Sequence, residues 1–156
     1  MNENNPMQPL HSEFLEKKCR VLAPVKEVCD VDAVLAYAGA RAAMHLTFLH
    51  VESVNQALAG AASDGNAEAL LGYAERRCRA VALAHESHIL AGDLVFSILD
   101  AAELLACDAI VMARVQERRR WRHLFSANIV RQVERKSREV PLIVIDANGL
   151  VIRSQR

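Results

Sequence analysis

A run of arginines is the part of this sequence with the clearest capacity for chemistry. Residues 113–128 read ARVQERRRWRHLFSAN, and the arginines in this run are Arg114, Arg118, Arg119, Arg120 and Arg122. A guanidinium group binds phosphates and carboxylates through two parallel hydrogen bonds. A helix that begins near Ser126 would add unpaired backbone N–H groups, which also favour anions. The run therefore predicts an anion site, to which Lys26 would contribute from an earlier loop.

Two other interpretations of the same run stay open. In the first and commoner one, the arginines belong to a solvated loop and pair with surface carboxylates or with a partner subunit. In the second, they bind nucleic acid and Trp121 stacks on a base. Residues 113–140 hold nine basic and three acidic residues, a charge of +6, so the rest of the neutral chain carries −6. Because that remainder would repel a nucleic-acid backbone, the sequence argues against this partner.

Residues outside the arginine run form no convincing catalytic or metal-binding set. His85 and His88 stand three residues apart, but they span an expected helix end and strand start, and no third ligand follows at a diagnostic spacing. Ser97 and Ser126 lack an evident histidine and carboxylate arrangement, and Cys107 lacks an activating neighbour. We therefore expect no catalytic residues, no metal and no enzyme activity.

Short apolar segments alternate along the chain with stretches of helical periodicity. The apolar segments indicate buried strands at 21–25, 46–51, 88–92, 109–112 and 142–145. Apolar residues at three- and four-residue spacing indicate helices at 31–44, 67–85 and 126–138, and a further helix that Asp93 caps and that reaches about Ala106. Residues 26–30 are expected to form a turn, and 150–152 a small extra strand.

This alternation predicts an α/β domain in which five parallel strands form a doubly wound, three-layer α/β/α sandwich. Ligands of such folds bind outside the carboxyl ends of the strands, where the strand order reverses. We therefore expect a nucleotide or anion to bind at the loops that follow three of the strands. The residues expected there are Pro24, Val25, Lys26, Val51, Met112, Ala113, Arg114, Gln116, Arg118, Arg120, Ser126, Ala127 and Asn128.

Length and composition fit an ordinary globular domain. The chain has 156 residues, of which 52% are apolar and 24% charged, enough for one core without disulfides. We expect an N-terminal extension at 1–19, the α/β domain at 20–146, and a tail at 147–156 that could supply an interface strand. No apolar run is long enough for a membrane span, and no secretory signal opens the chain. With four widely spaced cysteines, these features favour the cytoplasm.

Three segments of the chain resemble the universal stress protein family. The clearest is 90–112, where AGD is followed by an expected helix within the run ILDAAELLACDAIVM. In addition, VLAPV is similar to the family's first strand, and PLIVI is similar to its last. The resemblance spans about 20–146 and implies an adenine-nucleotide alpha-hydrolase-like fold and a role in the stress response. It also implies a homodimer, in which the expected contact residues, on an edge strand, are Leu142, Ile143, Val144 and Ile145. Any further protein partner is unknown.

The sequence departs from the family where ATP-binding members hold the nucleotide. Those members usually have an Asp after the first strand and, after the fourth, a Gly-x2-Gly-x9-Gly pattern followed by Ser or Thr. Here Lys26 stands at the Asp position, and the other four positions hold Ala113, Gln116, Ser126 and Ala127. Glycines allow backbone N–H groups to approach phosphate oxygens. We therefore expect a binding or regulatory module without conventional ATP binding. The alternative is a nucleotide-responsive sensor or weak ATPase that binds ATP or AMP through the arginines.

Overall fold

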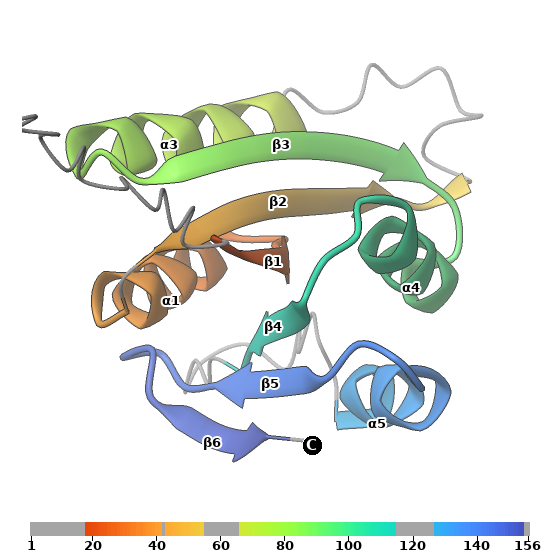
Figure 1. The fold of residues 1–156 in the computed structure, drawn as a ribbon. Coiled ribbons are helices and arrows are strands. Elements are labelled where there is room, and N and C mark those ends of the chain that lie inside the picture. Colours follow the sequence, from red (N-terminus) through yellow and green to blue (C-terminus); the bar gives the residue numbers. More distant parts are fainter. Residues whose placement is uncertain (1–17, 42, 55–65, 115–126, 155–156) are drawn as a thin grey trace, which may run out of the picture.

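Six strands form one sheet in the order β3-β2-β1-β4-β5-β6 (Figure 1). The structure, a computed structural model, describes residues 18–41, 43–54, 66–114 and 127–154. Its strands are β1 (Cys19–Pro24), β2 (Met44–Glu52), β3 (Ala84–Ala91), β4 (Ala109–Ala113), β5 (Leu142–Ile145) and β6 (Val151–Ser154). Its helices are α1 (Val28–Gly39), α3 (Asn66–Ala80), α4 (Leu94–Leu104) and α5 (Ala127–Lys136). The strand order reverses at β1 and β4, which lie side by side.

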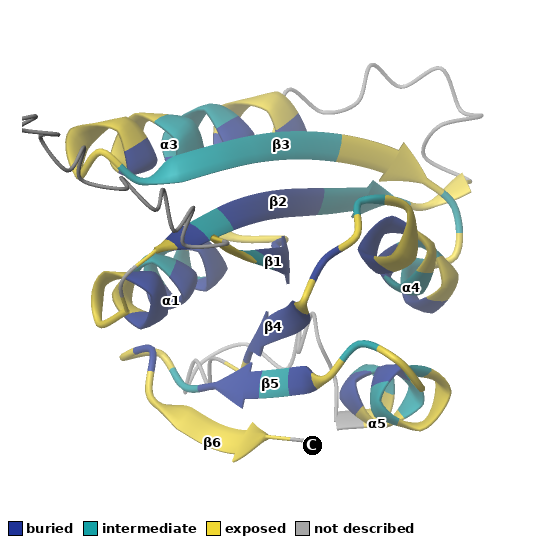
Figure 2. Cartoon of the chain, viewed as in Figure 1, coloured by how far each residue is buried: buried dark blue, intermediate teal, exposed yellow. Residues whose placement is uncertain are grey.

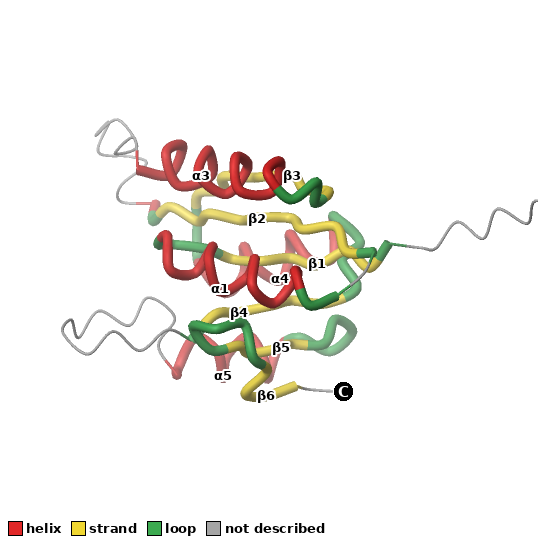
Figure 3. The backbone as a smooth tube through the Cα atoms, turned by 90° about the vertical axis from the view of Figure 1, so that its left-hand side faces the viewer, coloured by secondary structure: helices red, strands yellow, loops and turns green. Residues whose placement is uncertain are grey.

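The sheet is covered on both faces, and each face has its own apolar core. Helices α1 and α3 pack on one face with Val21, Leu46 and Val111. Helices α4 and α5 pack on the other with Leu22 and Ile110. Consecutive residues of a strand thus enter opposite cores, as the period of two requires. Figure 3 shows the two helix layers on either side of the strands, and Figure 2 shows that burial concentrates in β1, β4, β5 and the middle of β2. The α/β fold with helices on both faces is therefore confirmed.

The prediction of five parallel strands is wrong in one detail. β1 to β5 pair in parallel, but β6 adds a sixth strand that pairs antiparallel with β5. The two strands are joined by a tight turn at 146–149. A turn this short can join only antiparallel strands, because parallel strands need a longer crossover connection. β5 is consequently not the edge strand that the sequence suggested, since β4 and β6 occupy both of its sides. The homodimer stays a prediction, and at this end of the sheet a second copy would meet β6.

Several element boundaries differ from the sequence expectation for local reasons. α1 begins at Val28, within the expected turn, because the carboxylate of Asp30 caps its start. α3 ends at Ala80, and Ala82 takes a φ of 53° before β3 begins at Ala84. β3 begins four residues earlier than expected because its first half is polar and half-buried rather than apolar. The predicted cap of α4 is confirmed: Phe96 N–H donates to Asp93 Oδ1 at 3.0 Å.

Gly149 fixes the turn between β5 and β6 against helix α1. Its φ is +76°, and a Cβ atom built there would lie 2.4 Å from the backbone nitrogen of Tyr37 and 2.9 Å from the Cβ of Ala36. Both the conformation and the close approach require glycine. The turn therefore packs on the helix with no side chain between them, which ties β6 to the rest of the domain.

Gly149→Ala is expected to lower the free energy of unfolding by roughly 1–3 kcal/mol, since it adds a clash and a strained φ. Urea unfolding followed by circular dichroism measures the change. Gly39→Ala is the matched control, because a Cβ at Gly39 meets nothing within 4 Å. It should leave stability equal or slightly higher. Equal stability of Gly149→Ala and wild type would contradict this packing.

Candidate nucleotide or anion site

The predicted site lies at the carboxyl ends of β1 and β4, where the strand order reverses. β1 and β4 pair at Val21–Ala109 and Leu22–Ile110. Of the predicted residues, Pro24 ends β1 and is followed by Val25 and Lys26. Met112 and Ala113 end β4 and are followed by Arg114. Val51 lies near the end of β2, where this strand still pairs with β3. The structure thus brings the residues that follow β1 and β4 together at the carboxyl-terminal end of the sheet.

The rest of the predicted site falls mostly on residues that the structure does not describe. Gln116, Arg118, Arg120 and Ser126 lie outside the described residues, as does the side chain of Ala127. Asn128 is exposed in the first turn of α5. The arginine-lined anion pocket therefore stays a prediction, and the geometry of the described residues concerns the β1 and β4 loops.

A buried carboxylate occupies the loop after β1. Asp30 Oδ2 accepts hydrogen bonds from the backbone N–H groups of Lys26 at 2.9 Å and of Glu27 at 3.0 Å. Asp30 is 4% exposed and lies in the first turn of α1. A negative group is favoured there by the helix dipole. The chain therefore places its own anion where N–H groups at a helix start would otherwise face a ligand.

The neighbouring backbone groups at this edge are also paired within the protein. Val25 N–H donates to the Leu49 carbonyl oxygen at 2.8 Å, and the Val25 carbonyl oxygen lies 3.1 Å from His50 Nδ1. Arg114 N–H donates to the Ile145 carbonyl oxygen at 2.8 Å. The strand ends are therefore tied to β2 and β5, and these N–H groups do not point to an open ligand site.

Burial perturbs the titration of Asp30. Desolvation raises the pKa of Asp30 above its ordinary value of 3.8, and the backbone N–H groups of Lys26 and Glu27 oppose this rise. The side chains of Lys26 and Arg114, by contrast, are exposed. The described part of the site thus combines exposed cations with one internal carboxylate, an arrangement that sequence reasoning missed. The only signal was an acid three residues after Glu27, a spacing typical of a helix start.

Comparisons with solved structures identify the fold. Protein MJ0577 superposes with a TM-score of 0.64 and 16% identity over 83% of this chain and 96% of that chain. A universal stress protein family protein from Arabidopsis thaliana, with AMP bound, gives 0.62 and 14% over 82% of this chain and 91% of that chain. The universal stress protein from Archaeoglobus fulgidus in complex with dAMP gives 0.59 and 17% over 81% and 95%.

This chain has the universal stress protein fold. The resemblance drawn from VLAPV, 90–112 and PLIVI is thereby confirmed at the level of the fold. No family model and no curated protein sequence matches the chain. Within the universal stress protein fold, Asp30 and the paired strand ends are the features of the described residues that bear on ligand binding.

A second titratable cluster lies on β1, β2 and β3, away from the predicted site. Glu86 Oε1 accepts a hydrogen bond from Thr47 Oγ1 at 2.9 Å and lies 3.5 Å from Arg20 Nη1. His45 Nε2 and His88 Nε2 lie 3.9 and 3.8 Å from the same oxygen. Burial pushes the pKa of Glu86 up, but the Thr47 hydrogen bond and the nearby cations outweigh it and lower the pKa. The cluster therefore stabilises an ionised glutamate between strands.

The histidine pair considered in the sequence does not act as a unit. His85 and His88 both lie in β3, so a spacing of three places them on opposite faces of the strand. His85 Nδ1 lies 2.9 Å from the Leu83 carbonyl oxygen. Among the described residues, no group of His, Cys, Asp or Glu is arranged to hold a metal ion, and no helix is long and apolar enough to cross a membrane.

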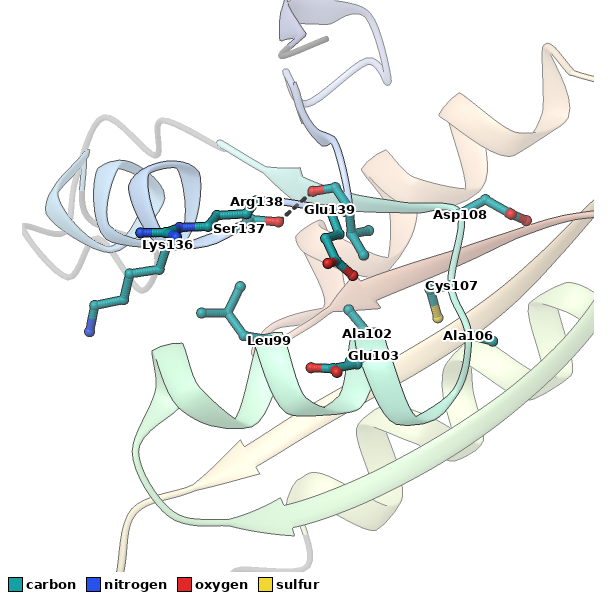
Figure 4. A pocket seen from close by; sticks show the side chains of 11 residues that line it. Leu99, Ala102, Glu103, Ala106, Cys107, Asp108, Lys136, Ser137, Arg138 and Glu139 are labelled. Carbon is teal, nitrogen blue, oxygen red and sulfur yellow. Dashed lines mark hydrogen bonds between the residues drawn. The ribbon is translucent and has the colours of Figure 1, made fainter.

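A hollow of about 540 Å³ lies at the opposite end of the sheet, between the end of α4 and the segment after α5 (Figure 4). Its charged lining comprises Glu103, Asp108, Lys136, Arg138 and Glu139. Ser137 Oγ donates to the Val140 carbonyl oxygen and holds the segment in place. The acids and bases nearly balance, so this hollow shows no preference for a ligand of one charge.

The buried cysteines are unsuited to nucleophilic chemistry. Burial raises the pKa of Cys78 and of Cys107 to about 11. A thiol with such a pKa is almost entirely protonated at neutral pH, and the thiolate is the nucleophile. The packing role expected for Cys107 accords with its 7% exposure.

Asp30→Ala is expected to cost roughly 1–3 kcal/mol of unfolding free energy, because it leaves the N–H groups of Lys26 and Glu27 without an acceptor. Asp30→Asn keeps an oxygen acceptor and should cost clearly less. Urea unfolding of the two variants beside wild type measures both effects. An alanine variant as stable as wild type would show that the carboxylate does not hold this loop.

The raised pKa of Asp30 also predicts a pH dependence. Because the pKa of Asp30 is higher in the folded protein than in the unfolded chain, the folded protein binds the carboxyl proton more tightly. The free energy of unfolding therefore falls as the pH rises above 3.8. Wild type should therefore lose stability relative to Asp30→Asn between about pH 4 and about pH 7. Unfolding curves at both pH values give the difference. A gap between the proteins that does not change with pH would contradict the raised pKa.

Proposed function

We propose that this chain is a non-catalytic binding and regulatory module of the stress response that does not bind ATP in the manner of glycine-rich family members. The proposal rests on the hydrogen bonds that the backbone N–H groups make at the carboxyl ends of β1 and β4. The N–H groups of Lys26 and Glu27 donate to Asp30, and that of Arg114 donates to β5.

Phosphate binding by main-chain amides needs N–H groups that are free to turn toward the ligand. At the described strand ends these groups already have internal acceptors. Asp30 already serves as the acceptor for the N–H groups of the loop after β1, and Lys26 stands where the family pattern has an aspartate. The four changed positions of the glycine pattern, Ala113, Gln116, Ser126 and Ala127, support the same conclusion.

The proposed absence of catalysis rests on the side chains. Within the described residues, the histidine nearest the strand ends is His50, and its Nδ1 is engaged with the Val25 carbonyl oxygen. The Asp93 carboxylate caps α4, and the Cys107 thiol is buried. A general base, a nucleophile and an oxyanion-stabilising group are thus not brought together in this part of the chain.

A nucleotide-responsive sensor is the alternative, and one observation favours it. The solved structures that share this fold include complexes with AMP, dAMP and cAMP. Here such a ligand would use cations rather than amides: Lys26 and Arg114 are exposed at the strand ends. Arg118 and Arg120 would follow from the arginine run.

Calorimetric titration of the full chain separates the two functions. We expect no saturable heat with ATP, ADP, AMP or cAMP up to millimolar concentration. A variant that restores the family pattern, with Lys26→Asp, Ala113→Gly, Gln116→Gly, Ser126→Gly and Ala127→Ser, should gain a measurable ATP signal if it keeps its helical spectrum.

Binding of a nucleotide to wild type would contradict the proposal. If that signal weakened with salt and disappeared in the double variant Arg118→Ala with Arg120→Ala, the sensor would be the correct function. Release of phosphate from ATP by wild type but not by this double variant would add weak ATPase activity.

A further inference from the structure

The strand β6 leaves an open edge at one end of the sheet. Among the described residues, β6 pairs only with β5, so its outer backbone groups face away from the sheet. All of its residues are exposed (Figure 2). The neighbouring apolar side chains are exposed as well: Leu150 by 65%, Val151 by 44% and Ile152 by 55%. An exposed apolar edge strand is a template for pairing with another chain.

A basic hollow adjoins this edge. It measures about 580 Å³ and lies between the outer face of α5 and β6, with a lining of Asn128, Arg131, Gln132, Glu134, Arg135 and Arg153. Arg153 Nη2 lies 2.9 Å from Glu134 Oε1, so that pair is neutralised. Arg131 and Arg135 are exposed, and no ion pair involves them within the described residues. With respect to the part of the chain that the structure describes, the hollow therefore carries two uncompensated positive charges.

We propose that β6 and the hollow beside it form a docking site for an extended acidic segment of a partner protein. The segment adds a strand to the outer edge of β6, and its backbone pairs with the open N–H and carbonyl groups. Its carboxylates reach Arg131 and Arg135, and its apolar side chains cover Val151 and Ile152. Main-chain pairing supplies affinity in this mode, while the flanking side chains supply specificity.

Charge argues for this occupant over a second copy of the chain. Two β6 strands paired antiparallel about a two-fold axis would keep both α5 helices on the same face of the joined sheet. The arginines that form no ion pair among the described residues, Arg131 and Arg135 from each copy, would then lie on that same face. Like charges brought together oppose association. An acidic segment removes this repulsion, so it complements the surface where a second copy does not.

The backbone edge argues against a nucleic acid. The open edge of a strand presents N–H donors and carbonyl acceptors in alternation, and another peptide strand is their complement. A phosphodiester backbone offers acceptors alone, and it has no favourable contact for Val151 and Ile152 beyond its bases. The arginines together with the open strand edge therefore favour a polypeptide over a nucleic acid.

A labelled peptide in which glutamate and valine alternate tests the site. Fluorescence anisotropy with the full chain should show saturable binding that weakens as salt increases. The double variant Arg131→Glu with Arg135→Glu should weaken binding at least about tenfold. Amide hydrogen exchange should slow at 151–154 when the peptide is bound.

Matched controls separate this site from general charge attraction. Arg76→Glu with Arg79→Glu on α3 makes the same charge change at exposed positions and should alter affinity by less than about twofold. A peptide alternating glutamate with glycine carries the same charge but pairs poorly as a strand, and it should bind at least about tenfold more weakly.

Three results would overturn the proposal. The first is equal binding of the glutamate–glycine peptide, which would indicate charge attraction alone. The second is unchanged affinity in the α5 double variant, or slowed exchange outside 151–154. The third is a concentration-dependent dimer, seen by sedimentation, that protects 151–154 and excludes the peptide, which would assign the edge to a second copy.

Discussion

Burial of β1 and β4 between two helix layers is the constraint on which the rest of the structure depends. Leu22 and Ile110, paired across these strands, are both 0% exposed. A strand without access to water must satisfy its backbone groups within the sheet. The two central strands are therefore held in register, and their ends meet at one edge of the domain. The position of the candidate site follows from this packing before any ligand is considered.

Asp30 shows how the same backbone chemistry can serve structure in place of binding. The start of a helix carries N–H groups without partners in the helix itself, and these groups attract an anion. In this chain the anion is a carboxylate from the helix's own first turn, and it accepts from Lys26 and Glu27. The loop gains rigidity and loses its vacant donors. A loop whose donors are paired in this way fits the proposed module without conventional ATP binding.

The charge of the molecule is distributed unevenly, although the net charge is zero. Basic residues concentrate in 113–140, and the structure adds Arg153 to them from the far side of the β5–β6 turn. The β5–β6 hairpin brings Arg153 there, and Gly149 lets the turn of that hairpin lie directly on α1. The sheet edge and the basic surface of α5 are thus joined by one hairpin.

The sequence by itself determined the α/β fold class and the strands near 21–25, 109–112 and 142–145, and it indicated the strand ends as the place to expect a site. These follow from apolar runs and helical spacing, which are local properties of the chain. Only the tertiary structure decided that β6 covers β5, that His85 and His88 face opposite ways, and that Asp30 fills the loop after β1. It also decided that Arg153 joins Arg131 and Arg135. Each of these depends on contacts between segments distant in sequence or on the orientation of a side chain, and periodicity carries no information about either.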